Sequence, residues 1–173
     1  MSSVSEATIG GSAWIDPPVD IVSTSKRSEM MSRVRSSNTR PELLLRSQIH
    51  QLGFRFRVNV STLPGKPDLV FPKFRTAVFV HGCFWHQHRN CRRATLPSTR
   101  ATWWKTKLEG NVLRDKASIR KLRRSGWTVV VVWECQIERN PGLAATSLAR
   151  KLRSKESCRR NDATGRSTVH YRR

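Results

Sequence analysis

Residues 81–91 read HGCFWHQHRNC and place three histidines, two cysteines and two aromatic residues in one short segment. The packing of an apolar core would not select this mixture, because histidine and cysteine offer lone pairs that bind metal ions. An apolar run, 77–80, leads into the segment, and a second one, 127–133, ends just before Glu134 and Cys135. We therefore interpret the segment as a loop at the end of a strand and as the centre of a functional site.

The elements around this loop are those of an α/β domain. Apolar residues alternate with polar ones over 54–60, and the continuous apolar runs are short, as in buried strands. Longer stretches with an apolar stripe predict helices, and Pro41 suits the first turn of one. In chain order we expect a short helix over 30–35, a helix over 40–52, strands over 54–60, 68–71 and 77–80, a helix over 102–124, a strand over 127–133 and a helix over 142–153.

The composition suits one domain that binds a polyanion. The chain has 173 residues, enough for a modest core, and its 33 Lys plus Arg against 12 Asp plus Glu give a formal net charge of +21. Such a charge repels itself unless nucleic acid neutralises it. Residues 1–24 carry no Lys or Arg, and residues 154–173 are polar and rich in Arg. We expect a flexible acidic tail over 1–24, a domain over 25–153 and a flexible basic tail over 154–173.

The sequence contains no apolar run near the length of a membrane span, about 20 residues, and its N-terminus lacks the pattern of a signal peptide. We expect a cytoplasmic monomer that does not bind a membrane. In a reducing compartment the four cysteines are metal ligands or free thiols rather than disulfides. Cys158, in the polar tail, is the candidate free thiol.

Two acidic residues interrupt the apolar faces of predicted helices. Asp115 fills the place between Val112 and Ile119 in the stripe of the 102–124 helix, and Glu42 heads the inward face of its own helix. A carboxylate on an inward face needs a cation, a metal ion or hydrogen-bond donors. Each acid therefore either belongs to a site or forms a structural ion pair with an arginine. Glu42 has a third interpretation, the stabilisation of a helix N-terminus by its charge.

Three cysteines and one histidine have the spacing of a zinc site. Cys83, His88 and Cys91 lie in one loop, and Cys135 follows a strand. Such a set is a common tetrahedral ligand set for structural zinc. His86 is a competing ligand, and the alternative to a metal site is a set of unrelated reduced cysteines.

Asp68 and two histidines form a candidate catalytic group. The rigid Pro67-Asp68 step opens a strand, and a carboxylate held there can bind Mg2+. His81 and His86 come after the next strand, and a histidine that titrates near neutral pH can take a proton from an attacking water. Each residue has an ordinary alternative, since aspartate is common in turns and a lone histidine is more often a packing or zinc residue.

Four aromatic residues are candidates for contacts with nucleic acid. Phe84 and Trp85 lie in the ligand loop, and Trp103 and Trp104 follow a stretch rich in Arg and Thr. Loop aromatics beside basic residues can stack on bases or wedge between base pairs. They can equally cover a zinc site as a small core. Two further tryptophans lie in the 127–133 strand and are assigned to the core.

Five strings of the sequence occur in the order of a known family: SKRSEMMSRVRSSNTRPE, LPGKPD, VFVHGCFWHQHRNC, NVLRD and VVWEC. Through them the chain, from about Ser25 to Ile137, resembles the very short patch repair endonucleases, which nick DNA beside T:G mismatches that arise from deaminated 5-methylcytosine. The resemblance implies a Mg2+-dependent endodeoxyribonuclease with a restriction-endonuclease-like α/β core, a mixed sheet flanked by helices and a structural zinc site. The implied substrate is double-stranded DNA with a T:G mismatch, nicked 5′ of the T. Mismatch-repair proteins and a repair polymerase at a bacterial nucleoid are further expected partners.

The resemblance also implies roles for individual residues. Mg2+ would be held by Asp68 and the backbone carbonyl of Val80, and His86 would help to activate water. The supporting active-site positions are Glu42, His81 and Asp115. The zinc ligands would be Cys83, His88, Cys91 and Cys135. The DNA contacts would be Phe84, Trp85 and Trp104 on the major-groove side, with Met31 and Val34 along the minor groove.

The chain departs from the family's pattern at two positions. The spacing from His88 to Cys91 is one residue longer than in the best-known member, and Val80 stands where that member has a hydroxyl residue. The 77–80 strand also lacks the acid and lysine of ordinary nucleases of this fold. Two rival functions stay open: a zinc-containing DNA-binding protein without catalysis, and a nuclease of the same fold that cuts matched sites or RNA.

Overall fold

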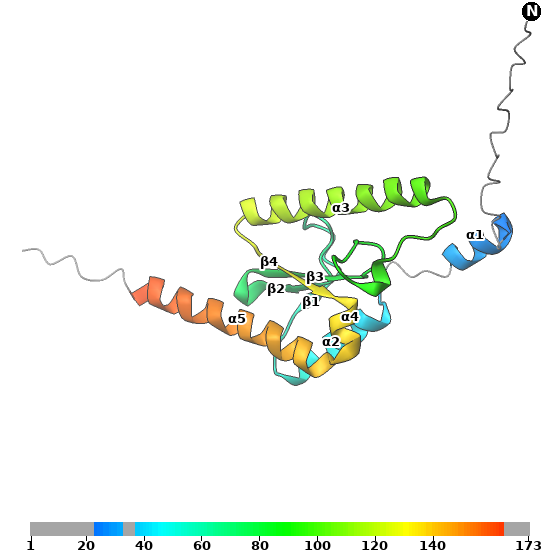
Figure 1. Cartoon of the computed structure of the whole chain (residues 1–173). Helices are drawn as coiled ribbons and strands as arrows, with labels where there is room; N and C mark the ends of the chain where they lie inside the picture. The colour runs from blue at the N-terminus through cyan, green and yellow to red at the C-terminus, as the bar shows by residue number, and fades with distance from the viewer. Residues whose placement is uncertain (1–22, 33–36, 165–173) are drawn as a thin grey trace, which may run out of the picture.

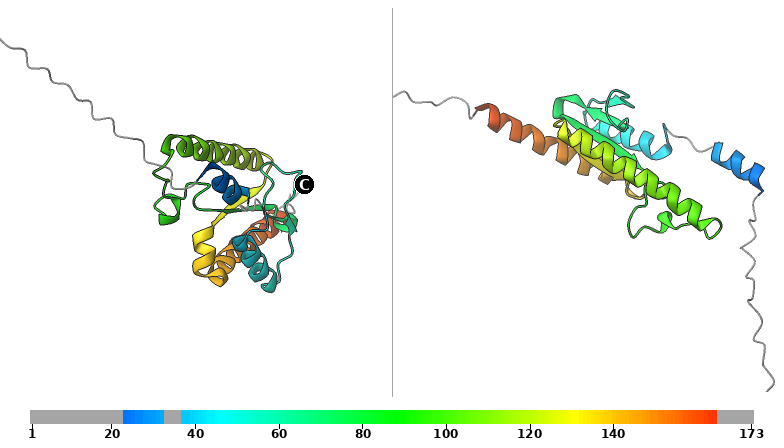
Figure 2. Two further views of the ribbon diagram at one scale, coloured as in Figure 1. Left: turned by 90° about the vertical axis from the view of Figure 1, so that its right-hand side faces the viewer. Right: turned by 90° about the horizontal axis from the view of Figure 1, so that it is seen from above.

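The structure, a computed structural model, describes residues 23–32 and 37–164 of the chain (Figure 1). It contains one sheet, and Figure 2 shows that α3 and α5 lie on opposite sides of this sheet. The elements are α1 (Thr24–Ser32), α2 (Arg40–Gln51), β1 (Arg57–Val58), β2 (Leu69–Phe71), the 3-10 helix η1 (Pro72–Phe74), β3 (Thr76–His81), the 3-10 helix η2 (Arg92–Ala94), α3 (Ala101–Arg124), β4 (Thr128–Trp133), α4 (Glu134–Arg139) and α5 (Pro141–Thr164).

The sheet has the order β1-β2-β3-β4 and mixed strand directions. β2 pairs antiparallel with both β1 and β3, whereas β3 and β4 are parallel. Parallel neighbours need a long crossover, which the loop after β3 and the helix α3 supply. The architecture confirms the predicted α/β class with a mixed sheet flanked by helices.

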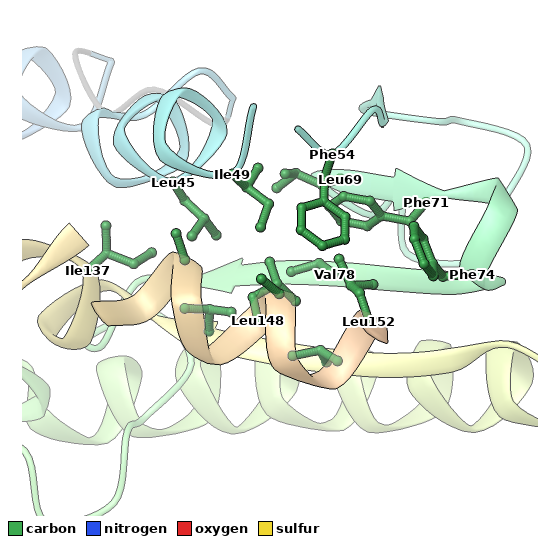
Figure 3. Close-up of a cluster of buried hydrophobic side chains, with 14 residues drawn as sticks. Leu45, Ile49, Phe54, Leu69, Phe71, Phe74, Val78, Ile137, Leu148 and Leu152 are labelled. Carbon is green, nitrogen blue, oxygen red and sulfur yellow. The ribbon is translucent and has the colours of Figure 1, made fainter. Parts of the chain in front are cut away.

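Helices pack on each face of the sheet. On one face α2, α4 and α5 enclose the larger core cluster, which includes Leu45 and Val78 (Figure 3). On the other face α3 covers Ala77 and Phe79 with Leu122. Successive residues of β3 therefore point to opposite cores, which explains why the sequence of this strand is apolar on both faces.

The segment 54–60 is shorter as a strand than its alternating pattern predicts. Only Arg57–Val58 pairs with β2. Phe54 is buried and packs edge-on against Phe71, with ring centroids 6.4 Å apart, while Val58 is 47% exposed. The prediction of a strand over the whole segment is wrong, because the alternation of apolar and polar residues comes from aromatic side chains that enter the core from a loop.

The helix boundaries also differ from the prediction. The first helix spans Thr24–Ser32 rather than 30–35, and residues 33–36 lie outside the described part of the chain. The short α4 is absent from the predicted elements; Asn140 separates it from α5 and accepts a hydrogen bond from the Leu143 N–H at 2.9 Å. α5 runs on to Thr164, past the expected end at 153, and the division into a domain and two tails stays a prediction. Within the described ranges no helix has the length and apolarity needed to cross a membrane.

The turn between β1 and β2 packs closely on α3. Gly65 has a φ of +76°, and a Cβ at this position would lie 2.8 Å from Ser118 Cβ and 3.2 Å from Phe79 Cζ. The Lys66 N–H donates to the Leu63 carbonyl at 3.0 Å and closes the turn. Only glycine combines this backbone conformation with so close an approach. The turn thereby fixes where β2 begins relative to α3.

Substituting Gly65→Ala should destabilise the domain more than Gly53→Ala. Gly53 also has a positive φ, +85°, but a Cβ there would meet nothing within 4 Å. We expect Gly53→Ala to cost about 1 kcal/mol from backbone strain, and Gly65→Ala about 1–3 kcal/mol more from overlap with α3. Urea unfolding of the two variants measures the difference, and equal losses would show that the turn does not press on the helix.

Candidate functional site

A cavity of about 720 Å³ opens between the N-terminal end of α2, the turn before β2, the end of β3 and the middle of α3. It brings together residues that are far apart in the sequence. The sequence-predicted residues that line it are Glu42, Asp68, Val80, His81, Trp85, His86 and Asp115. The pairing of β2 with β3 ends at Leu69 and Val78, so the last residues of β3 extend beyond β2 into this cavity.

Asp68 and Val80 form a pair of oxygen donors in the cavity. The Val80 N–H donates to Asp68 Oδ2 at 2.7 Å. Because the N–H and C=O of one strand residue point to the same side of the strand, the Val80 carbonyl also lies on the Asp68 side. Carboxylate and carbonyl oxygens are the ligands that hard divalent cations take. The donor set therefore fits a cation such as Mg2+.

The electrostatic surroundings of Asp68 favour a cation as well. Burial is the main cause that raises the pKa of Asp68 to about 6; the Val80 N–H opposes this rise, and the negative charge of Glu42 adds to it. A divalent cation beside the carboxylate would stabilise its ionised form. The pKa and the donor geometry thus indicate the same kind of ligand.

His86 and Asp115 form a hydrogen-bonded pair across the cavity. His86 Nδ1 lies 2.5 Å from Asp115 Oδ2. A carboxylate accepts the proton of the nitrogen that faces it, so Nδ1 carries the hydrogen and Nε2 is left with a free lone pair. Asp115, which the apolar stripe of α3 marked as an inward acid, therefore orients a histidine rather than forming an ion pair with an arginine.

His81 supports one face of the His86 ring. Its ring is stacked on that of His86, with centroids 3.9 Å apart and an interplanar angle of 11°. Burial lowers the pKa of His81 to about 4; His86 contributes to the lowering, and Asp115 opposes it. His81, His86 and Asp115 also form a group that could hold a metal, but the short hydrogen bond and the stacked rings describe a proton-transfer pair on an uncharged support more directly.

Glu42 is buried, with 4% of its surface exposed, and among the described residues it accepts hydrogen bonds from the start of α2 and from one turn further along the helix. Its Oε2 accepts hydrogen bonds from the Asn38 N–H at 2.9 Å and from Arg46 at 2.8 Å, and its Oε1 accepts one from the Thr39 hydroxyl at 2.8 Å. The two ordinary interpretations, a helix N-terminus and an ion pair with arginine, therefore both hold. Glu42 still lines the cavity and acts on Asp68 through its charge.

The four predicted zinc ligands converge beside the cavity. The ligand atoms of Cys83, His88, Cys91 and Cys135 all lie within 4.8 Å of one another. His88 Nδ1 is 3.6 Å from Cys83 Sγ and 3.4 Å from Cys135 Sγ. Zinc–sulfur bonds of about 2.3 Å and zinc–nitrogen bonds of about 2.0–2.1 Å at a tetrahedral angle require a sulfur–nitrogen separation of roughly 3.6 Å. The side chains thus have the dimensions of a tetrahedral metal site.

The chemistry of the thiols agrees with a metal at this position. Burial is the main cause that raises the pKa of the Cys83 thiol to about 12, so without a cation this buried group keeps its proton. A metal ion would take the place of the thiol protons. His86, the competing ligand, is directed to Asp115 instead and does not belong to this group.

A turn joins His88 to Cys91. The Cys91 N–H donates to the His88 carbonyl at 3.3 Å, and Asn90 has a φ of 58°. Asparagine tolerates this left-handed conformation better than most residues, which suits the third position of such a turn. The turn therefore brings Cys91 close to the other three ligands.

Trp133 connects the metal-ligand group with the cavity. Its ring stacks on His88, with centroids 4.1 Å apart and an interplanar angle of 10°, and meets His81 edge-on at 5.4 Å. The last pair of the parallel ladder, His81 with Trp133, brings these rings together. The assignment of Trp133 to the core describes only part of its environment.

The loop aromatics gather at the edge of the cavity. Phe84 packs edge-on against Trp85 and Trp104, with ring centroids 5.1 and 5.3 Å apart, and Trp103 packs against Trp104 at 4.9 Å. Trp85 lines the cavity, and Trp103 is 47% exposed. The cluster combines a small core beside the metal-ligand loop with an accessible aromatic edge. Val34 and the side chain of Met31 lie outside the described residues.

Sequence reasoning missed Glu134. Its Oε2 accepts a hydrogen bond from the Cys83 N–H at 3.0 Å, its Oε1 lies 3.5 Å from Arg93, and its side chain lines the cavity. It therefore anchors the start of the ligand loop to the end of β4. The available signal was its position, an acid directly between the aromatic end of a strand and Cys135.

The chain is similar in sequence to several known proteins. Residues 19–93 match the model of the family described as DNA mismatch endonuclease Vsr. The chain is 48% identical to the type II nicking enzyme V.XorIIP of Xanthomonas oryzae pv. oryzae, over 68% of this chain and 86% of that protein. It is 40% identical to the type II nicking enzyme V.NmeAIP of Neisseria meningitidis, over 78% and 94% of the two chains. It is 37% identical to the DNA mismatch endonuclease Vsr of Escherichia coli, over 77% and 85%.

Substituting Cys135→Ser should remove the bound metal and destabilise the domain together, because a structural metal contributes its binding free energy to folding. We expect metal content by elemental analysis to fall from about one ion per chain to near zero, with a lower melting temperature. Cys158→Ser, which changes the cysteine that the sequence assigns to a free thiol, is the control and should leave both unchanged. Full metal occupancy in the Cys135 variant would contradict the ligand set.

Proposed function

The chain belongs to the DNA mismatch endonuclease Vsr family, and from this premise we propose that it nicks duplex DNA 5′ of the T in a T:G mismatch, the product of 5-methylcytosine deamination. It is a DNA-cleaving hydrolase by family, and DNA is its partner. The observation that supports the specific reaction best is the cavity in which Asp68 and Val80 face the His86–Asp115 pair. Oxygen donors for a cation and a free imidazole nitrogen would supply charge stabilisation and a general base, both of which promote phosphodiester hydrolysis.

In the proposed mechanism each of these residues has a distinct role. Asp68 and the Val80 carbonyl would hold Mg2+, which supplies positive charge to stabilise the negative charge that develops on the phosphate. His86 accepts a proton from the attacking water at Nε2, and Asp115 stabilises the imidazolium through the Nδ1 hydrogen bond. His81, held uncharged by burial, fixes the plane of the His86 ring by stacking. Glu42 keeps the end of α2 in position and adds negative charge that favours the cation.

Zinc is the metal we propose for the Cys83, His88, Cys91 and Cys135 group, because three thiolates and one imidazole with tetrahedral dimensions suit it best. In this role it holds the loop that carries His86. Phe84, Trp85 and Trp104 would wedge against bases next to the mismatch, and Met31 and Val34 would follow the minor groove. Wedging costs a few kcal/mol of unstacking, which a mismatched pair lowers, so selectivity for T:G follows in part from its easier deformation.

A second candidate is strand-specific nicking of a matched site. It is favoured by the names of two relatives, which are type II nicking enzymes. The same catalytic residues would serve both reactions, so only the substrate distinguishes them. A nicking assay with Mg2+ and end-labelled duplexes distinguishes the two candidates. Each duplex carries a T:G pair in one of several flanking contexts, or the matched T:A or C:G pair in its place. A single nick 5′ of the mismatched T, lost on adding a chelator, supports the proposal. Cutting of matched duplexes supports the second candidate, and binding without cleavage supports a non-catalytic DNA-binding protein.

Substituting Asp68→Ala or His86→Ala should abolish nicking while DNA binding stays largely intact, because both residues act on the reacting phosphate and water. We expect rate losses of about 10²-fold or more for His86, the range of general-base catalysis, and at least as much for Asp68. His50→Ala changes an exposed histidine in the last turn of α2 and serves as the control. Retained nicking in either active-site variant, with the control unaffected, would overturn the catalytic assignment.

A further inference from the structure

The second half of α3 carries a strongly basic surface outside the catalytic cavity. From Lys116 to Arg124 the helix reads KASIRKLRR, with five basic residues and no acid. Four of them surround a shallow hollow of about 700 Å³ together with Ile119. All four are exposed, and they form the α3 basic surface: Lys116, Arg120, Arg123 and Arg124.

The charges of the α3 basic surface are not neutralised by acids of the described residues. In the part of the chain that the structure describes, no carboxylate forms an ion pair with any of its four side chains. Basic residues in the last turn of a helix favour its negative end, which accounts for Arg123 and Arg124. This effect fades within one turn and does not account for Lys116 and Arg120. Like charges so close together repel each other, so an external anion would be bound favourably.

The α3 basic surface adjoins the catalytic cavity. Ile119 lines both the cavity and the basic hollow, and Lys116 directly follows Asp115. In Figure 1 α3 runs along one face of the sheet. The cavity and the basic hollow are lined by successive parts of this helix. With a rise of about 1.5 Å per residue, Arg124 lies roughly 13 Å along α3 from Asp115. This length corresponds to about four base-pair steps of duplex DNA, at about 3.4 Å each.

We propose that the α3 basic surface is a phosphate-binding site for the duplex flank, which holds the sugar–phosphate backbone several base pairs from the cleaved bond. Exposed arginines suit phosphate oxygens because their guanidinium groups donate in pairs. Contacts of this kind position a duplex without reading its sequence. The proposal rests on DNA as the substrate, and it holds whether the cleaved site is a T:G mismatch or a matched site.

The test compares two variants with the same loss of charge. The first, Arg120→Gln with Arg123→Gln and Arg124→Gln, changes the α3 basic surface. The second, Arg139→Gln with Arg150→Gln and Lys151→Gln, changes exposed residues of α4 and α5, on the other face of the sheet. Binding is titrated without added Mg2+, so that the DNA is not cut. The duplexes are a short one and two others extended by about ten base pairs on one flank or the other, each with a T:G pair and with its matched counterpart.

We expect the parent protein to bind one of the extended duplexes more tightly than the short one. The α3 variant should lose this gain and bind the short duplex nearly as the parent does, whereas the control variant should keep the gain. If three phosphate contacts are lost, raising salt from about 50 to about 200 mM should weaken binding of the long duplex roughly 40-fold less in the α3 variant than in the parent.

Three outcomes would overturn the proposal: no gain from either extension in the parent, a gain that the α3 variant keeps, or equal losses on short and long duplexes. Equal losses on short and long duplexes would indicate general electrostatic attraction. A gain that the α3 variant keeps would indicate that the surface binds an acidic partner other than DNA. The single change Arg120→Gln repeats the test if the triple variant unfolds. Nicking of the short T:G duplex tests the proposed function separately, since it does not depend on the flank.

Discussion

The convergence of one histidine and three cysteines is the interaction on which the arrangement of the site depends. Cys83 follows β3 and Cys135 follows β4, and these strands are parallel with His81 opposite Trp133. The register of the ladder therefore brings the two cysteines to the same edge of the sheet. The loop returns to this edge with His88 and Cys91 and closes the group. A metal bound at its centre would tie this loop, which carries His86, to the ends of both strands.

His86 shows how the ligand group constrains the geometry of the cavity. It lies between Cys83 and His88 in sequence, so ligands on both sides restrict where its ring can go. Within that restriction, Asp115 binds one ring nitrogen and the His81 ring supports one face. Trp133 contacts both His81 and His88. One side chain therefore packs against the ring that supports His86 and against the metal-ligand group. Loss of the metal would therefore disturb the cavity even though no metal ligand of the group lines it.

The sequence predicts well those features that arise from continuous patterns. The two parallel strands and the long helix between them follow from apolar runs and a helical stripe, and the stripe also marks Asp115 as an inward acid. Patterns fail where tertiary contacts decide. Phe54 alternates like a strand residue yet reaches the core from a loop, because β2 offers only three residues for pairing. Glu134 gives no periodic signal, since its role comes from one backbone N–H more than fifty positions before it in the chain.

The two inward acids, which share one pattern in the sequence, have different physical roles. Asp115 accepts a hydrogen bond from the imidazole of His86 and so fixes the orientation of that ring. The oxygens of Glu42 accept hydrogen bonds from Asn38, Thr39 and Arg46, which hold the carboxylate at the start of α2, and its charge acts on Asp68. That charge, added to burial, makes an ionised Asp68 unfavourable in the cavity on its own. A divalent cation beside Asp68 would remove this penalty, so the same groups that disfavour an isolated carboxylate would favour a bound cation in the cavity.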